Sequence, residues 1–233
     1  DVILRPDIST CRLVPWYDEP TAQIIHDAVH QDGADVTFSS RAVLKSVLAL
    51  FDAAGLEPVI APELEFFLVK QSSDANAPLI TPPGRSGRAE KARQAYGIDA
   101  VNEFDPLFEE IYDHCDVQGL DIDTLSHEAG AAQMEINFNH GHALDLADQA
   151  FLFKRTVRQA AINHHLHATF MAKPIQEQPG SAMHVHVSVK SKESGKNIFS
   201  NDDGSESDDF YHSIAGMQRY LSGAMALMAP YVN

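Results

Sequence analysis

Three stretches of the chain alternate polar and apolar residues one by one, and this pattern constrains the fold more than any other feature. They lie within Glu57–Lys70, Gln133–Asn139 and Met183–Ser188. Successive side chains of a β-strand point to opposite faces, so each stretch predicts a strand with one polar and one apolar face. We therefore expect a sheet that packs one face into a core and lines a polar cavity with the other.

The last of these strands follows a loop, within the sequence AKPIQEQPGSAMHVHVSVK at 172–190. Its polar face carries His184, His186 and Ser188. Its apolar face, which we predict to pack into a core, carries Met183, Val185 and Val187. Gly180 precedes the strand and lets the backbone approach a ligand closely. Two imidazoles two residues apart can serve one polar cavity; the alternative is one partly buried and one exposed histidine without a ligand.

The stretch Glu57–Lys70 carries two carboxylates on one face. Glu63 and Glu65 share this face, and Leu64 and Phe66 share the other. Two neighbouring carboxylates beneath aromatic packing raise the free energy of the fold unless a cation neutralises them. A solvent-facing strand edge is the alternative, but the apolar residues on both sides favour a buried sheet.

The third strand lies in the sequence HEAGAAQMEINFNH at 127–140, where Glu128 precedes a loop of small residues. Four polar side chains then share one face: Gln133, Glu135, Asn137 and Asn139. Three apolar side chains share the other: Met134, Ile136 and Phe138. A polar face with a carboxylate and amides is typical of a cavity wall, and an ordinary half-exposed antiparallel strand is the alternative.

Apolar residues at helical spacing predict four helices. Their ranges are 41–54, 105–118, 144–168 and 210–229. Ser39 or Ser40 caps the first helix and Gly55 ends it, while Gly119 ends the second. We expect the fourth, which is rich in Met, Leu and Ala, to pack into the core. Three histidines at the end of the third complement its dipole: His164, His165 and His167.

The remaining segments predict a hairpin and a long loop. A strand over 21–29, the Asp32-Gly33 turn and the short run 34–38 favour the hairpin. Residues 71–95 form the loop, with four basic residues in an otherwise acidic chain: Arg85, Arg88, Lys91 and Arg93. Loops of this length are often lids or binding segments, and a solvated linker is the alternative.

Charge and cysteine content exclude several classes of protein. With a net charge of −16 and a pI near 5.0, the chain has no basic footprint for a nucleic acid. Two cysteines, Cys11 and Cys115, make no disulfide framework, and no apolar run reaches the length of a membrane span. We therefore expect a cytoplasmic protein with free thiols and no nucleic-acid or membrane partner. Both ends look cut, which predicts a part of a longer protein.

The polar faces of the predicted strands supply one set of candidate metal ligands. The set is Glu63, Glu65, Glu128, Glu135 and His184, with His186 beside them. Oxygen-rich sets suit Mg²⁺ or Mn²⁺, whereas zinc favours Cys or more His. Four carboxylates in one cavity indicate two or more ions, which commonly clamp a transferring phosphoryl group. This chemistry predicts a two-metal enzyme of phosphoryl transfer or hydrolysis.

A long, spaced signature resembles the ATP site of the glutamine synthetase family. It comprises Lys173-Pro174-Ile175, Pro179 to His184, and Ser188. Three further motifs are similar to that family's interdomain connector, its metal strand and its second pair of carboxylates: Pro6-Asp7 with Thr10 and Pro15-Trp16, Glu63-Leu64-Glu65-Phe66, and His127-Glu128 with Gln133-Met134-Glu135. The similarity covers essentially all 233 residues in the family's order.

The resemblance implies an α+β fold with a curved, mainly antiparallel sheet, lined with metal carboxylates and backed by helices. It implies the end of an N-terminal domain and its connector at 1–20, and a partial catalytic domain at 21–233. A ring-shaped homo-oligomer is expected of the full-length protein.

The resemblance also implies roles for individual residues. One Mg or Mn ion would be held by Glu65, Glu128 and Glu135, and the other by Glu63 and His184. ATP would be bound by Lys173, His186 and Ser188. Gly180 would lie against glutamate, and Tyr96 would line the entrance to the site.

The implied activity is ATP-dependent formation of a γ-glutamyl amide from glutamate and an amine, through γ-glutamyl phosphate. The segments GLDIDTLSHEAGAAQMEINF and PGSAMHVH resemble the γ-glutamylpolyamine (glutamate–putrescine) ligase branch, and Ala182 stands where true glutamine synthetases usually carry Gly. Putrescine or another polyamine is therefore the expected acceptor, and ammonia is the alternative. A non-catalytic member of the family is a further alternative, against which the intact metal ligands argue. A two-metal hydrolase does not account for the spacing of the ATP-site signature.

Overall fold

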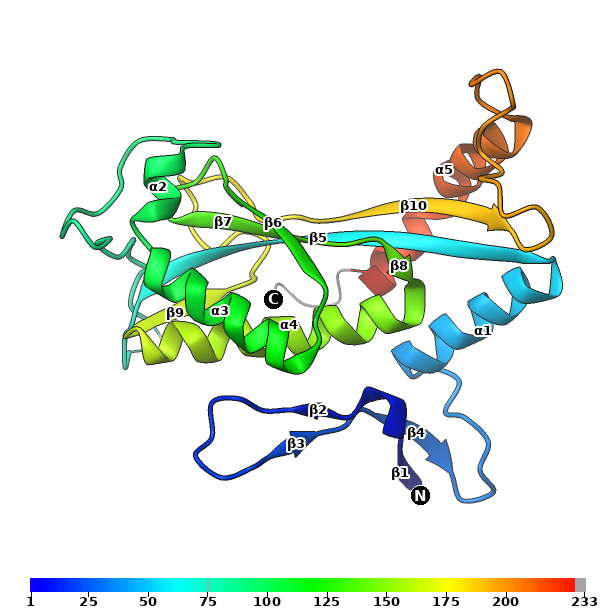
Figure 1. Cartoon of the computed structure of the whole chain (residues 1–233), viewed down its shortest axis with the longest axis horizontal. Helices are drawn as coiled ribbons and strands as arrows, with labels where there is room; N and C mark the ends of the chain where they lie inside the picture. The colour runs from blue at the N-terminus through cyan, green and yellow to red at the C-terminus, as the bar shows by residue number, and fades with distance from the viewer. Residues whose placement is uncertain (75, 229–233) are drawn as a thin grey trace.

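One long strand, β5 (Leu56–Lys70), organises the computed structural model, which describes residues 1–74 and 76–228. The main sheet runs β10–β5–β7–β6, and β8 and β9 also pair with β5, so that every pairing is antiparallel. Its other strands are β6 (Ile122–His127), β7 (Gln133–Phe138), β8 (Gly141–His142), β9 (Leu166–Thr169) and β10 (Met183–Ser191) (Figure 1). The predicted α+β class with a mainly antiparallel sheet is confirmed.

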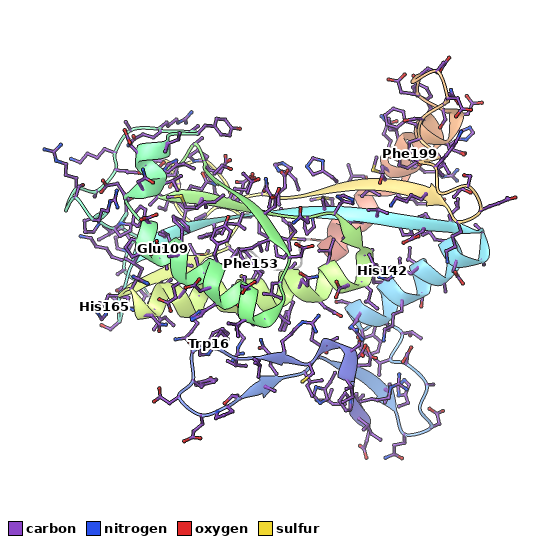
Figure 2. All side chains as sticks on the ribbon, in the orientation of Figure 1. Trp16, Glu109, His142, Phe153, His165 and Phe199 are labelled. Atoms are coloured by element: carbon purple, nitrogen blue, oxygen red, sulfur yellow. The ribbon has the colours of Figure 1, made fainter. Side chains whose placement is uncertain are left out.

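Two helices, α3 (Asp105–Gln118) and α4 (Ala143–Asn163), cover the apolar face of this sheet (Figure 1). That face carries five buried side chains from β5 and β7: Leu64, Phe66, Met134, Ile136 and Phe138. Phe138 meets Phe153 of α4, which is labelled in Figure 2, edge to face. The two ring centroids lie 5.2 Å apart. Each such side chain stabilises the fold by about 1.5–3 kcal/mol when it is fully buried. The alternation of the sequence thus fixes which face meets the helices.

The predicted helix boundaries hold for α1 (Ser40–Ala53) and α3. Ser39 is the residue before α1, and Gly55 follows it with a φ of +71°. Gly119 ends α3 in the left-handed conformation, with a φ of +64°, which glycine adopts without strain. A short helix, α2 (Ile98–Asn102), and the strand β6 were not predicted from the sequence.

The first 36 residues form two small sheets beside α3 and α4. β1 (Val2–Pro6) pairs with β4 (His26–His30), a 3-10 turn follows at Ile8–Thr10, and β2 (Arg12–Leu13) pairs with β3 (Ala22–Gln23). Gly33 turns the chain after β4 as predicted, and the Val36 N–H donates back to the Ala28 carbonyl. The predicted hairpin was wrong in its partner strand, because residues 34–38 form only an isolated bridge, Val29 to Asp35, and β4 pairs with β1 instead. Trp16 packs this region onto the helices, 5.7 Å from the His114 ring and 4.9 Å from the Arg155 guanidinium (Figure 2).

Arg41 of α1 connects three parts of the chain through carboxylates. Its guanidinium donates to Asp7 at 2.7 Å, to Asp27 at 2.7 Å and to Asp148 of α4 at 2.9 Å. Hydrogen bonds from Ser9 and Arg41 hold the pKa of Asp7 at about 2. Arg41, Asp27 and Asp148 are all largely buried, so this network fixes the N-terminal segment to the helical layer.

The predicted helix over 144–168 was wrong at its C-terminal end. α4 ends at Asn163, His165 has a φ of +58°, and Leu166–Thr169 form β9 on β5. Leu166 and Ala168 continue the apolar pattern of the helix, which is why the sequence did not reveal the boundary. Of the three histidines expected to complement the helix dipole, only His164 caps the helix, and it binds Glu110 at 2.8 Å.

Two predicted core faces were also wrong. Met183, Val185 and Val187 of β10 are exposed, as is most of α5 (Asp208–Met228), including Met217 and Leu221. β10 is an edge strand, and α5 runs across the direction of β10 and β5 in the view of Figure 1 with most of its side chains exposed. Neither apolar face is covered by a second layer within the described residues. Residue 229, which the predicted helix included, lies outside those residues. No helix within 1–74 and 76–228 has the length and apolarity that crossing a membrane requires.

Replacing Arg41 by Met is expected to destabilise the protein by about 3–5 kcal/mol, because buried Asp148 loses its guanidinium partner and Asp27 keeps only Lys45 of its two close cations. Urea unfolding followed by circular dichroism measures this loss. The control is Lys196→Met, which removes the exposed pair with Asp202 and is expected to change stability by at most about 1 kcal/mol. Equal losses for the two variants would contradict the structural role given to Arg41.

Candidate metal centre

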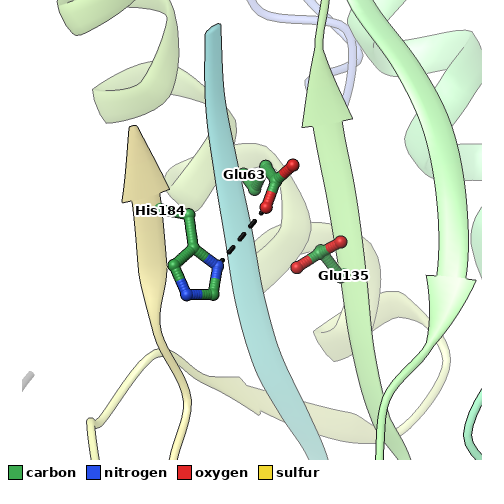
Figure 3. Close-up of side chains that lie close together, drawn as sticks. All are labelled: Glu63, Glu135 and His184. Carbon is green, nitrogen blue, oxygen red and sulfur yellow. Dashed lines mark ion pairs between the residues drawn. The ribbon is translucent and has the colours of Figure 1, made fainter. Parts of the chain in front are cut away.

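Three side chains from three neighbouring strands converge on the polar face of the sheet. Glu63 of β5, Glu135 of β7 and His184 of β10 each offer a ligand atom, and these atoms lie within 4.8 Å of one another (Figure 3). Antiparallel pairing places His184 opposite Glu63, and Glu65 opposite Glu135. The His184 Nδ1 atom lies 3.3 Å from a Glu63 carboxylate oxygen. Glu135 is buried and His184 is exposed, so the cluster is open on the β10 side.

Glu65 lies beside this cluster and is held by an amide. The Gln133 amide donates to Glu65 Oε2 at 3.0 Å and to the Gly180 carbonyl at 2.9 Å. It thereby connects β5, β7 and the loop before β10. The His184 Nδ1 atom lies 3.9 Å from the other Glu65 oxygen. The sequence placed Gln133 on the polar face but gave no signal for this bridging role.

Glu128 lies in the loop between β6 and β7, and its surroundings disfavour its charge. Burial, and then the negative charge of Glu65, raise its pKa. Burial acts in the same direction on Glu135, whose pKa is raised to about 7 with further contributions from Glu63, Glu128 and Glu65. The four predicted carboxylates are thus close enough to repel one another electrostatically.

The residues predicted to face ATP lie along β10 and its preceding loop. The His186 Nε2 atom lies 2.8 Å from Glu63 Oε1. His186 and Ser188 also line an open pocket of about 330 Å³, together with His140, Lys190 and Asn197. The Lys173 ammonium donates to the Gln178 carbonyl within its own loop.

Gly180 and Tyr96 lie at the margins of the polar face. A Cβ atom at Gly180 would come within 2.7 Å of the Ala172 carbonyl oxygen, so the loop requires glycine here. Tyr96 is exposed, with a φ of +61°, and its N–H donates to the His127 carbonyl at 2.8 Å. The side chain of Tyr96 is therefore free to contact a ligand, while its backbone is fixed to β6.

The donor set fits a hard divalent cation. Carboxylate oxygens dominate it, as Mg²⁺ and Mn²⁺ prefer, and one imidazole completes it. The Asn137 amide oxygen, on the strand position opposite Glu63, is buried and accepts no hydrogen bond from the described residues. The raised pKa values of Glu128 and Glu135 and the unpartnered Asn137 oxygen both indicate that this polar face lacks positive charge. A divalent cation held by Glu63, Glu135 and His184 would supply that charge.

Sequence comparison decides the family. The model of the family described as "Glutamine synthetase, catalytic domain" matches residues 37–233. The chain belongs to this family.

Similar proteins include a γ-glutamylputrescine synthetase and glutamine synthetases. Gamma-glutamylputrescine synthetase PuuA of Escherichia coli (strain K12) is 37% identical over 214 residues, which cover 91% of this chain and 45% of that protein. A glutamine synthetase of Halobacterium salinarum is 35% identical over all of this chain and 50% of that protein. The solved structure of apo GmaS superposes with a TM-score of 0.84 at 28% identity, covering 100% of this chain and 53% of that one. The chain therefore spans about half the length of the relatives that it matches.

Carboxylate repulsion predicts a pH dependence of the metal-free protein. The pKa of Glu135 rises from 4.5 to about 7 on folding, so the folded state binds this proton more tightly than the unfolded chain. The contribution of Glu135 to stability is therefore lost as the pH rises from about 4.5 through about 7. Thermal unfolding in chelator should show this loss, and Glu135→Gln should remove it.

The control is Glu193→Gln, an exposed carboxylate outside the site, which should leave the pH dependence unchanged. Adding Mn²⁺ should stabilise the unmodified protein most above pH 7, where Glu135 is charged. The same pH profile in the Glu135→Gln variant and the unmodified protein would refute the electrostatic account.

Proposed function

We propose that the protein containing this chain is an ATP-dependent glutamate–amine ligase that forms a γ-glutamyl amide. The observation that carries the proposal is the convergence of Glu63, Glu135 and His184 on one face of the sheet in a chain of the glutamine synthetase family. ATP and glutamate are the proposed substrates, with two or more Mg²⁺ or Mn²⁺ ions.

The proposed ligand sets share one wall. Glu65, Glu128 and Glu135 would hold one ion, and Glu63 and His184 the other. Glu135 would contribute to this second ion as well, because its carboxylate lies within 4.8 Å of the Glu63 and His184 ligand atoms. The mutual influence of Glu135, Glu63 and Glu65 supports adjoining sites. When bound, such ions neutralise phosphate charge and polarise phosphoryl oxygens, which lowers the barrier to phosphoryl transfer.

The chain's other residues would position the two substrates. Lys173, His186 and Ser188 are the proposed contacts to ATP, and Gly180 is the proposed contact to glutamate. The partner of His186 in this structure is Glu63. If Glu63 bound a cation, His186 would become available to contact the nucleotide. The pocket beside His186 and Ser188 offers room for part of the nucleotide.

The proposed reaction has two steps. An oxygen of the glutamate γ-carboxylate attacks the γ-phosphorus of ATP, the bond to the bridging oxygen breaks, and ADP leaves. The neutral amine then attacks the carbonyl carbon of γ-glutamyl phosphate, inorganic phosphate leaves, and the ammonium proton passes to a base.

We propose putrescine or another polyamine as the acceptor. Support comes from the segment PGSAMHVH, with Ala182 in place of Gly, and from the 37% identity to a γ-glutamylputrescine synthetase. The 35% identity to a glutamine synthetase keeps ammonia as the second candidate. A ring-shaped homo-oligomer, a cytoplasmic location and the division of the chain at residue 20 also remain proposals, as does a non-catalytic role.

Phosphate release by the full-length protein tests the function. With ATP, Mg²⁺ and glutamate present, putrescine is expected to stimulate release at least tenfold more than equimolar ammonia. Glu135→Ala is the control, and it should abolish the release because it removes a carboxylate of the proposed metal centre. Preference for ammonia would instead assign the protein as a glutamine synthetase. No release with any amine, despite bound metal, would refute the ligase proposal and favour the non-catalytic role.

A further inference from the structure

Glu90 lies in the long loop at 71–95, for which the sequence allowed either a lid or a solvated linker. Its side chain is nevertheless only 6% exposed. Its carboxylate accepts a hydrogen bond from the Ala132 N–H at 2.7 Å. The same carboxylate lies 3.0 and 3.1 Å from the His127 Nε2 atom. Glu90 thus contacts both ends of the loop that carries Glu128.

His127 is fully buried and is bound at both ring nitrogens. Its Nδ1 atom lies 2.6 Å from the Glu128 carbonyl oxygen, and its Nε2 atom faces the Glu90 carboxylate. A carboxylate only accepts hydrogen bonds, so the His127 Nε2 atom donates to Glu90. Loss of this bond would leave a polar group unsatisfied in the protein interior, which is costly.

The loop between these two contacts has an unfavourable backbone. Ala132 is fully buried and has a φ of +54°, a conformation that non-glycine residues rarely adopt. A Cβ atom at Gly130 would come within 2.6 Å of the Phe67 ring. The surrounding contacts must hold such a loop in place, and the bond from Ala132 to Glu90 is one of them.

We propose that Glu90 is a positioning residue that fixes the 128–132 loop, and with it the carboxylate of Glu128, in the conformation that binds metal. The inference rests on the proposed function, in which Glu128 is a metal ligand. Two hydrogen bonds connect the segment 90–96 to the chain around Glu128: Glu90 accepts the Ala132 N–H, and the Tyr96 N–H donates to the His127 carbonyl. In this role Glu90 does not bind the metal ion itself. It acts on Glu128 through its contacts with His127 and Ala132.

The proposal requires a carboxylate at position 90. Both groups that meet Glu90 are donors: the His127 Nε2–H and the Ala132 N–H. A glutamine of the same shape offers one acceptor oxygen, and its NH₂ group would face another donor. Glu90→Gln therefore weakens the contact without creating a cavity.

The test is Mn²⁺ titration of the full-length protein, followed by electron paramagnetic resonance of the free ion, with thermal unfolding measured in parallel. Loss of a group that orients a metal ligand typically weakens metal affinity 10–100-fold. Glu90→Gln is expected to weaken one class of Mn²⁺ site by this factor and to leave the other class unchanged. The matched control is Glu103→Gln, whose carboxylate accepts the Ser86 N–H in the same region and does not contact the 128–132 loop.

A second variant separates this inference from the proposed function. If Glu128→Gln weakens Mn²⁺ binding and Glu90→Gln does not, the positioning role is wrong while the metal assignment stands. If Glu128→Gln leaves both classes of site unchanged, the metal assignment itself is wrong. A uniform loss of both classes that parallels the loss of thermal stability would make Glu90 a merely structural residue and would overturn the inference.

Discussion

The antiparallel register of β5 with β7 and β10 is the constraint on which the site depends. Leu64, Met134 and Ile136 are buried on the helix-covered face, so a slip of one residue would exchange the core face for the polar face. Burial of these side chains therefore fixes the position of Glu63 and Glu135 on the opposite face. His184 follows because its strand pairs with β5 at Glu63. The packing of the core and the geometry of the candidate metal centre are consequences of one register.

This arrangement concentrates negative charge where the fold gains nothing from it. Burial and the neighbouring carboxylates raise the pKa values of Glu128 and Glu135, so in the metal-free protein the polar face opposes folding near neutral pH. Surrounding groups limit the cost: the Gln133 amide binds Glu65, and the Glu90–His127 pair holds the loop of Glu128. The carboxylates repel one another without a cation, and neighbouring groups hold them in place. Such a site is suited to a ligand of high positive charge.

Periodicity revealed much of this from the sequence. The polar faces of the three strands and the boundaries of α3, set by Pro106 and Gly119, follow from local chemistry. The end of α4 did not, because Leu166 continues the apolar pattern into β9. Alternation also shows that β10 has two faces without showing what covers them, and Val185 is exposed in the described structure. The contact between Glu90 and His127 joins residues 37 positions apart and leaves no local signal.

The central claim is that Glu63, Glu135 and His184 together hold a divalent cation. The most direct measurement is anomalous X-ray diffraction at the manganese edge, from crystals of the full-length protein grown with Mn²⁺. The account predicts an anomalous peak within coordination distance of all three side chains, about 2.0–2.6 Å from their ligand atoms. Saturating Mn²⁺ with no peak between these strands, or with a peak only elsewhere on the surface, would contradict it.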